Sequence, residues 1–270
     1  MDFREDQIHR YARHIILPEI GGGGQEALLR ARVLVVGAGG LGSPLLLYLA
    51  AAGVGTLGVI DDDVVDLSNL QRQVLHDTHA VGQAKTDSAV ARLQALNPDV
   101  TVQGINARLT AANALALVGD YDLVADGSDN FATRFLINDA CRLAGKPLVS
   151  AAILRFDGQI ATFRPQTGSP CYRCLFPEPP PPDRIPSCAQ AGVLGAMAGV
   201  MGALQAVEVV KELLGIGDSL AGRLLLVDVL AMRFETIRVP ADPSCPLCGS
   251  APTLTDLSHH QAPAIQECTL

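Results

Sequence analysis

Several polar side chains in the first half of the chain directly follow predicted strands, where an open parallel sheet binds its ligands. They are Asp61, Asn69, Arg72, Gln73, Lys85 and Asp129. Because the carboxyl ends of parallel strands meet at one edge of a sheet, these side chains are expected to converge there. Arg72 and Lys85 would neutralise phosphate oxygens, and Asp129 would hold Mg²⁺. Each residue alone is equally well explained as an exposed charge or a helix cap, but together they favour an ATP–Mg²⁺ site.

A glycine-rich loop precedes these residues. Its glycines are Gly37, Gly39, Gly40 and Gly42, in the run GAGGLG that matches G-x-G-x-x-G. The loop lies between a predicted strand at 32–36 and a predicted helix at 43–52, so its backbone can approach a phosphate at the helix N-terminus. Asp61, at the end of the next strand, is placed to bond ribose hydroxyls. The motif indicates a nucleotide without separating ATP from a dinucleotide. A dinucleotide-dependent oxidoreductase and a tight turn without a ligand are the competing interpretations.

Four of the seven cysteines form two C-x-x-C pairs. These are Cys171 with Cys174, and Cys245 with Cys248. Each spacing lets two thiolates meet one tetrahedral ion, and four sulfurs describe a closed, structural Zn²⁺ site. The long segment between the pairs means that zinc would clip the C-terminal part onto the preceding part of the chain. A redox pair and chance spacing are the alternatives.

The remaining cysteines differ in what their surroundings indicate. Cys188 lies between a proline-rich loop and a glycine-rich helix, and a nearby helix N-terminus lowers a thiol pKa. A nucleophile and an inert residue both fit this position. Cys141, on an apolar helix, is expected in the core, and Cys268 has no assigned role. The six histidines show no useful ligand spacing and are interpreted as structural or surface groups.

The composition fits a globular α/β protein, with 270 residues of which 49% are hydrophobic. The net charge of −8 argues against broad nucleic-acid binding, which needs a basic face. The N-terminus has no apolar secretory segment. The apolar stretch 189–210 is interrupted by Gln190, Gln205 and Glu208, so we expect a buried helix rather than a membrane span. An odd cysteine count with paired spacing indicates a reducing, cytoplasmic location.

Strand and helix patterns alternate along the first half of the chain. The predicted strands are 32–36, 56–60, 100–105, 122–125 and 147–152, and the predicted helices are 43–52, 82–96, 111–117 and 131–144. This alternation predicts an α/β fold of Rossmann type, with a mainly parallel sheet and helices on both faces. The second half predicts a hairpin turn at Asp157-Gly158 and antiparallel strands at 223–229 and 233–239.

Nine short motifs, in order along nearly the whole chain, resemble the ThiF/MoeB/HesA family, the bacterial relatives of ubiquitin-activating enzymes. They are Arg13 in RYARHI, GAGGLG, Asp61, SNLQRQ, VGQAK, the D-x-S-D-N stretch, CYRC, SCAQAGV and CPLC. The resemblance implies adenylation of the C-terminal glycine carboxylate of a ubiquitin-like sulfur-carrier protein that ends in Gly-Gly, with release of pyrophosphate. The residues it implies for ATP and Mg²⁺ are Asp61, Asn69, Arg72, Lys85 and Asp129. It also implies a homodimer in which Arg13 reaches into the partner's site.

The resemblance divides the chain into four expected parts. Residues 1–30 form a helical segment at the dimer interface, with a helix over 4–20 broken by Pro18 and the glycines at 21–24. Residues 31–153 form the ATP-binding half and 154–250 the carrier-binding half with the zinc clip. Residues 251–270 are expected to be a loose tail.

Several functional questions stay open at this level. In some relatives the cysteine matching Cys188 binds the carrier covalently, and in others adenylation suffices. The chain shows no rhodanese domain, so the sulfur donor is expected to be a separate cysteine desulfurase or rhodanese. The product pathway is molybdopterin, thiamin or thio-tRNA synthesis. A tRNA threonylcarbamoyladenosine cyclising ATPase and a non-enzymatic, zinc-clipped scaffold remain as alternatives.

Overall fold

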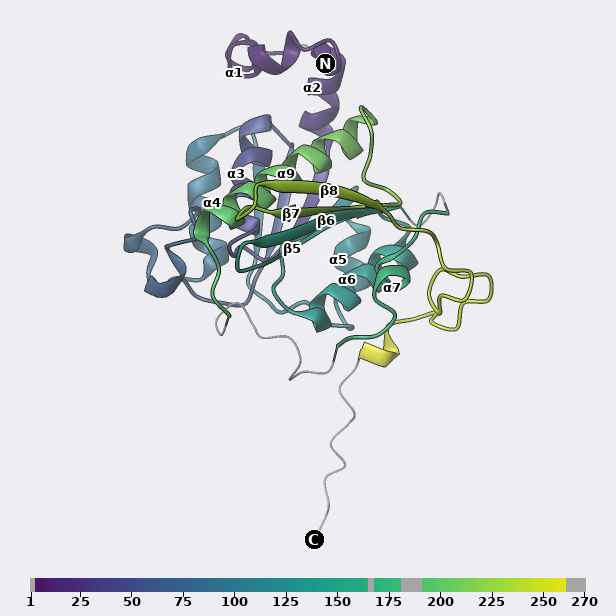
Figure 1. Cartoon of the computed structure of the whole chain (residues 1–270). Coiled ribbons are helices and arrows are strands. Elements are labelled where there is room, and N and C mark those ends of the chain that lie inside the picture. The colour runs from purple at the N-terminus through teal and green to yellow at the C-terminus, as the bar shows by residue number, and fades with distance from the viewer. Residues whose placement is uncertain (1–2, 165–167, 181–190, 261–270) are drawn as a thin grey trace.

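The computed structural model describes residues 3–164, 168–180 and 191–260, and within them eight strands form one sheet (Figure 1). The order across the sheet is β3-β2-β1-β4-β5-β6-β7-β8. Strands β1 to β5 pair in parallel, and β5 to β8 continue the sheet in antiparallel fashion. The strands are β1 (Arg32–Val36), β2 (Thr56–Ile60), β3 (Thr101–Ile105), β4 (Leu123–Asp126), β5 (Leu148–Leu154), β6 (Asp157–Phe163), β7 (Arg223–Asp228) and β8 (Arg233–Arg238). The predicted parallel half and antiparallel continuation are confirmed.

Helices cover both faces of the parallel half, as the alternating pattern predicts. The helices are α1 (Glu5–Ile15), α2 (Gly21–Arg30), α3 (Gly42–Ala52), α4 (Lys85–Leu96), α5 (Ala114–Gly119), α6 (Phe131–Ala144), α7 (Tyr172–Leu175) and α9 (Gly195–Leu214). Val33 and Val35 of β1 pack in the core with α3, α4 and α9. Leu34 and Val36 of the same strand face α5 and α6. The alternation of a strand's side chains between faces therefore builds two cores from one sheet.

The glycine run at 21–24 is the first correction. These glycines do not break a helix, because they form the first turns of α2, and the preceding helix ends earlier at Ile15. A Cβ on Gly24 would lie 3.0 Å from Ile20 and 3.5 Å from Leu214 of α9. Gln25 is fully buried and donates to the carbonyl of Ala52. Tertiary contacts thus stabilise a helix that its intrinsic propensity opposes.

The β5–β6 hairpin is confirmed, but its turn lies elsewhere than predicted. Leu154 pairs with Asp157, so Arg155 and Phe156 make the turn, and Arg155 has a φ of 55°. Gly158 lies inside β6, where an added Cβ would come within 2.4 Å of Met197 on α9. The glycine therefore marks a close helix approach rather than a turn.

One face of helix α9 is buried, as expected for the glycine- and alanine-rich segment, whereas Val207 is exposed, and the helix begins only at Gly195. Met197 and Met201 are fully buried, and a Cβ on Gly202 would lie 2.4 Å from Pro44 of α3. Small residues therefore let α9 pack closely on α3. None of the helices in the described ranges is both long and apolar enough to span a membrane.

The tail after Cys248 is less loose than expected over residues 251–260. Leu257 is buried in the core beside α6. His259 and His260 each place Nε2 against the Asp139 carboxylate, at 2.9 and 2.7 Å. Arg173 of α7 donates to both oxygens of the same carboxylate, at 2.9 and 2.6 Å. The buried Asp139 carboxylate thus joins α6, α7 and the tail through hydrogen bonds and ion pairing with Arg173.

Candidate active site

A cavity of about 310 Å³ lies at the carboxyl edge of the parallel strands, where sequence reasoning placed the ligand. The glycine loop forms its floor. Gly37 has a φ of 92°, and a Cβ on Gly42 would lie only 1.9 Å from the carbonyl oxygen of Gly37. The loop therefore closes so tightly that only glycine fits at these positions. The N-terminus of α3 follows directly, so free N–H groups and the positive end of the helix dipole face the cavity.

Two side chains, those of Asp61 and His76, form hydrogen bonds to the glycine loop. Asp61 accepts from the N–H of Ala38 at 2.8 Å and from that of Asp63 at 2.9 Å. The buried His76 contacts the carbonyl of Ala38 through Nε2 at 2.9 Å, and Ser88 through Nδ1 at 2.8 Å. A carbonyl only accepts, so Nε2–H donates and Nδ1 accepts the hydroxyl proton of Ser88. The N–H and the carbonyl of Ala38 are therefore both hydrogen-bonded, the first to Asp61 and the second to His76.

His76 should make stability depend on pH. Burial lowers the pKa of His76 below its ordinary value of 6.5. The folded state therefore prefers the neutral ring, and its stabilising contribution is complete above pH 6.5 and is lost as the pH falls through the folded pKa. We expect the free energy of unfolding, measured with urea from pH 8 to pH 5, to fall less steeply in His76→Gln than in the wild type. The exposed His79→Gln is the control and should keep the wild-type slope. Equal slopes in all three proteins would contradict this role.

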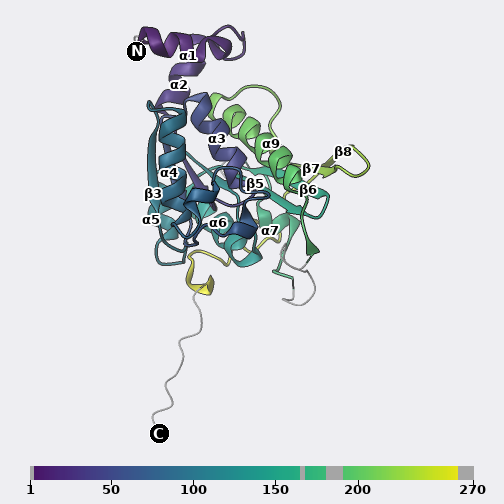
Figure 2. The same ribbon diagram turned by 90° about the vertical axis from the view of Figure 1, so that its left-hand side faces the viewer.

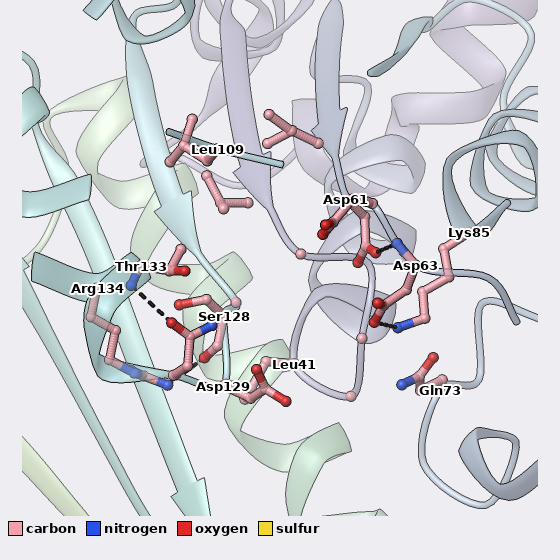
Figure 3. Close-up of a pocket in the computed structure, with 18 of the residues that line it drawn as sticks. Leu41, Asp61, Asp63, Gln73, Lys85, Leu109, Ser128, Asp129, Thr133 and Arg134 are labelled. Carbon is pink, nitrogen blue, oxygen red and sulfur yellow. Dashed lines mark hydrogen bonds and ion pairs between the residues drawn. The ribbon is translucent and has the colours of Figure 1, made fainter. Parts of the chain in front are cut away.

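Both predicted cations line the cavity, and Figure 3 shows Lys85 on one side of it. Lys85 is buried and pairs with the exposed carboxylate of Asp63 at 2.7 Å. Arg72 also lines the cavity, and its Nη1 donates to the carbonyl of Ser68 at 3.1 Å. Gln73, which also lines the cavity, is buried, and its Oε1 has no hydrogen-bond partner among the described residues. Two cations and an unsatisfied amide therefore face one cavity.

Asn69 does not line this cavity in the described structure. Its carbonyl accepts from the backbone N–H of Arg72 at 3.1 Å and of Gln73 at 2.9 Å. It therefore shapes the turn that presents these two residues.

Asp129 lies across the cavity from Lys85, on the loop after β4 (Figure 3). A buried hydrogen-bond network beside Asp129 was not predicted from the sequence. Asp126 accepts from the N–H and hydroxyl of Ser128, at 2.9 and 2.6 Å. The buried Arg134 donates to the carbonyls of Ser128 and Ala151. Asp126 lies in the D-x-S-D-N motif and Arg134 lies close to it. Nothing in the motif distinguishes a buried structural residue from an exposed ligand.

Arg13 is a predicted site residue that lies away from the cavity. Arg13 is exposed on α1, which Figures 1 and 2 show set off from the body of the molecule. Tyr11 of the same helix packs on Gly53 and accepts from Asn97 at 2.9 Å, at the C-terminal ends of α3 and α4. Arg13 therefore belongs to the opposite edge of the sheet and cannot serve the cavity of its own chain. Cys188 lies outside the described residues, as does Cys268.

The two C-x-x-C pairs meet, as predicted. Their four Sγ atoms lie within 4.8 Å of one another, with Cys171 to Cys245 at 3.6 Å and Cys174 to Cys248 at 3.3 Å. Sulfurs bound tetrahedrally at about 2.3 Å from zinc would be about 3.8 Å apart, close to these values. Burial and the neighbouring thiols raise the pKa of Cys171 well above its usual value. Burial and contact with Cys174 raise the pKa of Cys248 to about 12. Hydrogen bonds from its neighbours lower the pKa of Cys245, so one thiolate is favoured, whereas ionisation of all four thiols together needs a cation. The donor set therefore fits a structural metal ion.

A second cavity, of about 590 Å³, opens beside the first, and we call it the trough. It covers the face of β5 to β8 opposite α9. Two rows of paired residues form this face, namely Leu154, Asp157, Asp228 and Arg233, then Ala152, Gln159, Leu226 and Glu235. Asp129, Asn130, Arg134 and Ile153 line both cavities. A chain lying in the trough would therefore reach the nucleotide cavity beside Asp129.

The ThiF family model matches residues 11–247 of the chain. The chain belongs to the ThiF family. The chain is 54% identical over 266 residues to a sulfur carrier protein adenylyltransferase of Thermus thermophilus, covering 97% of this chain and 98% of that relative. It is 51% identical over 261 residues to the SAMP-activating enzyme E1 of Haloferax volcanii, covering 96% of each chain. Membership in this family favours adenylation over the oxidoreductase interpretation.

Other similar proteins are longer or more distant. The adenylyltransferase and sulfurtransferase MOCS3 of Bos taurus is 54% identical over 258 residues, which cover 95% of this chain and 56% of MOCS3. The crystal structure of E. coli MccB with MccA-N7isoASN superimposes with a TM-score of 0.77 at 23% identity, over 90% of this chain and 74% of MccB. That likeness confirms the fold.

Proposed function

We propose that this ThiF-family protein uses ATP to adenylate the C-terminal glycine carboxylate of a ubiquitin-like sulfur-carrier protein, with release of pyrophosphate. The names of the full-length relatives support adenylyl transfer to a sulfur carrier. The observation that carries the proposal is the junction of the two cavities at Asp129 and Arg134. One cavity has the glycine loop and cations that a nucleotide needs. The other is long and partly apolar and holds the extended tail of the carrier.

The residues lining the first cavity are suited to hold ATP and Mg²⁺. Phosphates lie over the glycine loop between Arg72 and Lys85, with Lys85 leaving Asp63 to meet them. Asp61 is placed for the ribose, although each of its oxygens already accepts one backbone N–H. Carboxylate oxygen is the ligand that Mg²⁺ prefers, so Asp129 holds it. When bound, Mg²⁺ neutralises charge on the phosphates.

The chemistry needs little from the protein beyond position and charge. The carboxylate of the carrier is ionised at neutral pH, so it attacks the α-phosphate without a general base. Its oxygen forms the new bond to phosphorus while the bond to the pyrophosphate oxygen breaks. Arg72 and Lys85 stabilise the charge on the phosphates, and the trough aligns the carboxylate. The carrier adenylate is then the substrate of a sulfur donor of the cysteine desulfurase or rhodanese class, with Cys188 as the candidate for a covalent step.

Zinc is the metal we assign to the four cysteines. The site is closed, with four sulfurs and no open position, so its role is structural. It pins the segment of Cys245 and Cys248 onto α7 beside the trough.

Arg13 is proposed to complete the site of a partner subunit. Its helix exposes Ile8 and Ile16, at 49% and 68%, which a homodimer would cover. We expect Arg13→Ala to lower carrier-dependent activity by about 10- to 100-fold, the loss of a charge-assisted hydrogen bond. Mixing Arg13→Ala with Lys85→Ala should restore up to about a quarter of wild-type activity, since each mixed dimer holds one complete site. Failure to restore any activity from subunits shown to exchange would exclude a shared site.

The proposed function is tested by ATP–pyrophosphate exchange. Purified protein is incubated with ATP, Mg²⁺, labelled pyrophosphate and a Gly-Gly carrier from the same organism. We expect exchange with the intact carrier and none with a carrier lacking its last glycine. Absence of exchange with every Gly-Gly carrier of the organism would refute the proposal.

A further inference from the structure

Tyr172 carries a buried hydroxyl that the fold leaves unused. The residue is 3% exposed, and its hydroxyl has no hydrogen-bond partner among the described residues. An enclosed polar group without a partner is costly, and a phenylalanine would fill the same space without that cost. The hydroxyl therefore calls for a partner that arrives from outside the described chain.

The position of the ring is tightly determined. Phe135 and Phe163 meet it edge-on, with ring centroids at 5.2 and 6.0 Å, and Phe176 packs at 5.0 Å. The backbone N–H of Tyr172 donates to Asn138 at 2.8 Å. Cys171 and Cys174 flank the residue, so the zinc cluster sets the turn that carries it. The hydroxyl is therefore a preorganised group.

Tyr172 lines the trough near its junction with the nucleotide cavity. It shares that wall with Arg134, which also lines the nucleotide cavity. Among the other residues that line the trough, Phe131, Ala152 and Leu226 are apolar, and Gln159 lies between Ala152 and Leu226 across the strands. A recessed donor beside apolar residues suits a backbone carbonyl, which a bulky side chain on the same segment would hold away.

We propose that Tyr172 is a specificity-determining residue that donates its hydroxyl hydrogen to a backbone carbonyl in the Gly-Gly end of the carrier. This inference rests on the proposed function and adds the group that favours glycine there. Only residues without a side chain let the backbone approach a recessed hydroxyl. The zinc cluster, through the turn that carries Tyr172, would then help to select the substrate.

Tyr172→Phe tests the role, because it removes only the oxygen. We expect the KM for the carrier in pyrophosphate exchange to rise about three- to tenfold, the usual effect of one hydrogen bond. The KM for ATP should stay unchanged, and the unfolding midpoint should stay level or rise. Tyr121→Phe is the matched control, because the hydroxyl of Tyr121 donates to Gln103 outside the trough. This variant should leave both KM values unchanged.

A second substrate sharpens the test. Replacing the penultimate glycine of the carrier by alanine should raise the carrier KM of the wild-type enzyme. The same change in the carrier should raise the carrier KM of Tyr172→Phe less, because the variant has no hydrogen bond to lose. An unchanged carrier KM in Tyr172→Phe would overturn the inference, and a lowered unfolding midpoint with that result would assign the hydroxyl to internal structure. Wild-type protein that shows no carrier-dependent exchange would instead refute the proposed function.

Discussion

Asp129→Asn should lower the rate of carrier-dependent pyrophosphate exchange by about 10²- to 10³-fold, the usual effect of removing one preorganised electrostatic group. Asparagine keeps the size of the side chain and removes the charge proposed to hold Mg²⁺. Asp129 lines the same cavity as Arg72 and Lys85, and hydrogen bonds of the neighbouring Ser128 to Asp126 and Arg134 hold its loop. The loop should therefore keep its shape in the variant, and the loss should appear as weaker activation by Mg²⁺.

The control for Asp129→Asn is Asp87→Asn. Asp87 is exposed in the first turn of α4, two residues after Lys85, and does not line the cavity. It should retain nearly wild-type exchange, and both variants should keep the wild-type unfolding midpoint. If the exchange rate of Asp129→Asn stays within about threefold of the wild-type rate across a Mg²⁺ titration, this carboxylate does not hold the metal.

Loss of the proposed zinc ion should strongly destabilise the part of the chain that holds the four cysteines. Cys245→Ser breaks the cluster that ties the segment of Cys245 and Cys248 to α7. Leu257 and the two histidines after it dock only a short distance beyond this clip. We expect the variant to purify without zinc and to lose about 4 kcal/mol or more of stability. That is about 8–16 °C in the unfolding midpoint of a domain of this size.

Cys141→Ala is the matched control for the cluster. Cys141 is a buried thiol on α6 that lies outside the zinc site, as the sequence predicted for a core cysteine. Its replacement should cost some stability through a small cavity while zinc content stays at one ion per chain. Zinc measured by elemental analysis and the midpoint measured by calorimetry separate the two effects. If wild-type protein without zinc had the same unfolding midpoint as wild-type protein with zinc, a structural role of the ion would be contradicted.

The sheet and the nucleotide loop could be predicted because their signals are local. Strands β1 and β2 and helix α6 begin and end where the pattern places them, since apolar runs bounded by glycine or an acid leave few alternatives. The two C-x-x-C pairs likewise carry their chemistry in their spacing. The cluster at the carboxyl edge follows from strand order, because parallel strands end together.

The remaining features depend on contacts between distant segments. The glycines of α2 predict a helix break from sequence alone. Contacts of α2 with distant segments, made by Gln25 and Gly24, stabilise the helix instead. The side chain of His76 joins two distant segments, since it contacts Ala38 and Ser88. The trough arises from the register of four strands, which alternation alone does not determine. Arg13 adds a further case, because its proposed site lies on another subunit.

The most direct measurement of the central claim is a single turnover with ATP labelled at the α-phosphate and an excess of enzyme over a Gly-Gly carrier. The account predicts that label appears on the carrier at its terminal carboxylate, in step with pyrophosphate release, and that Asp129→Asn suppresses both. Release of inorganic phosphate with no label on the carrier would contradict adenylation.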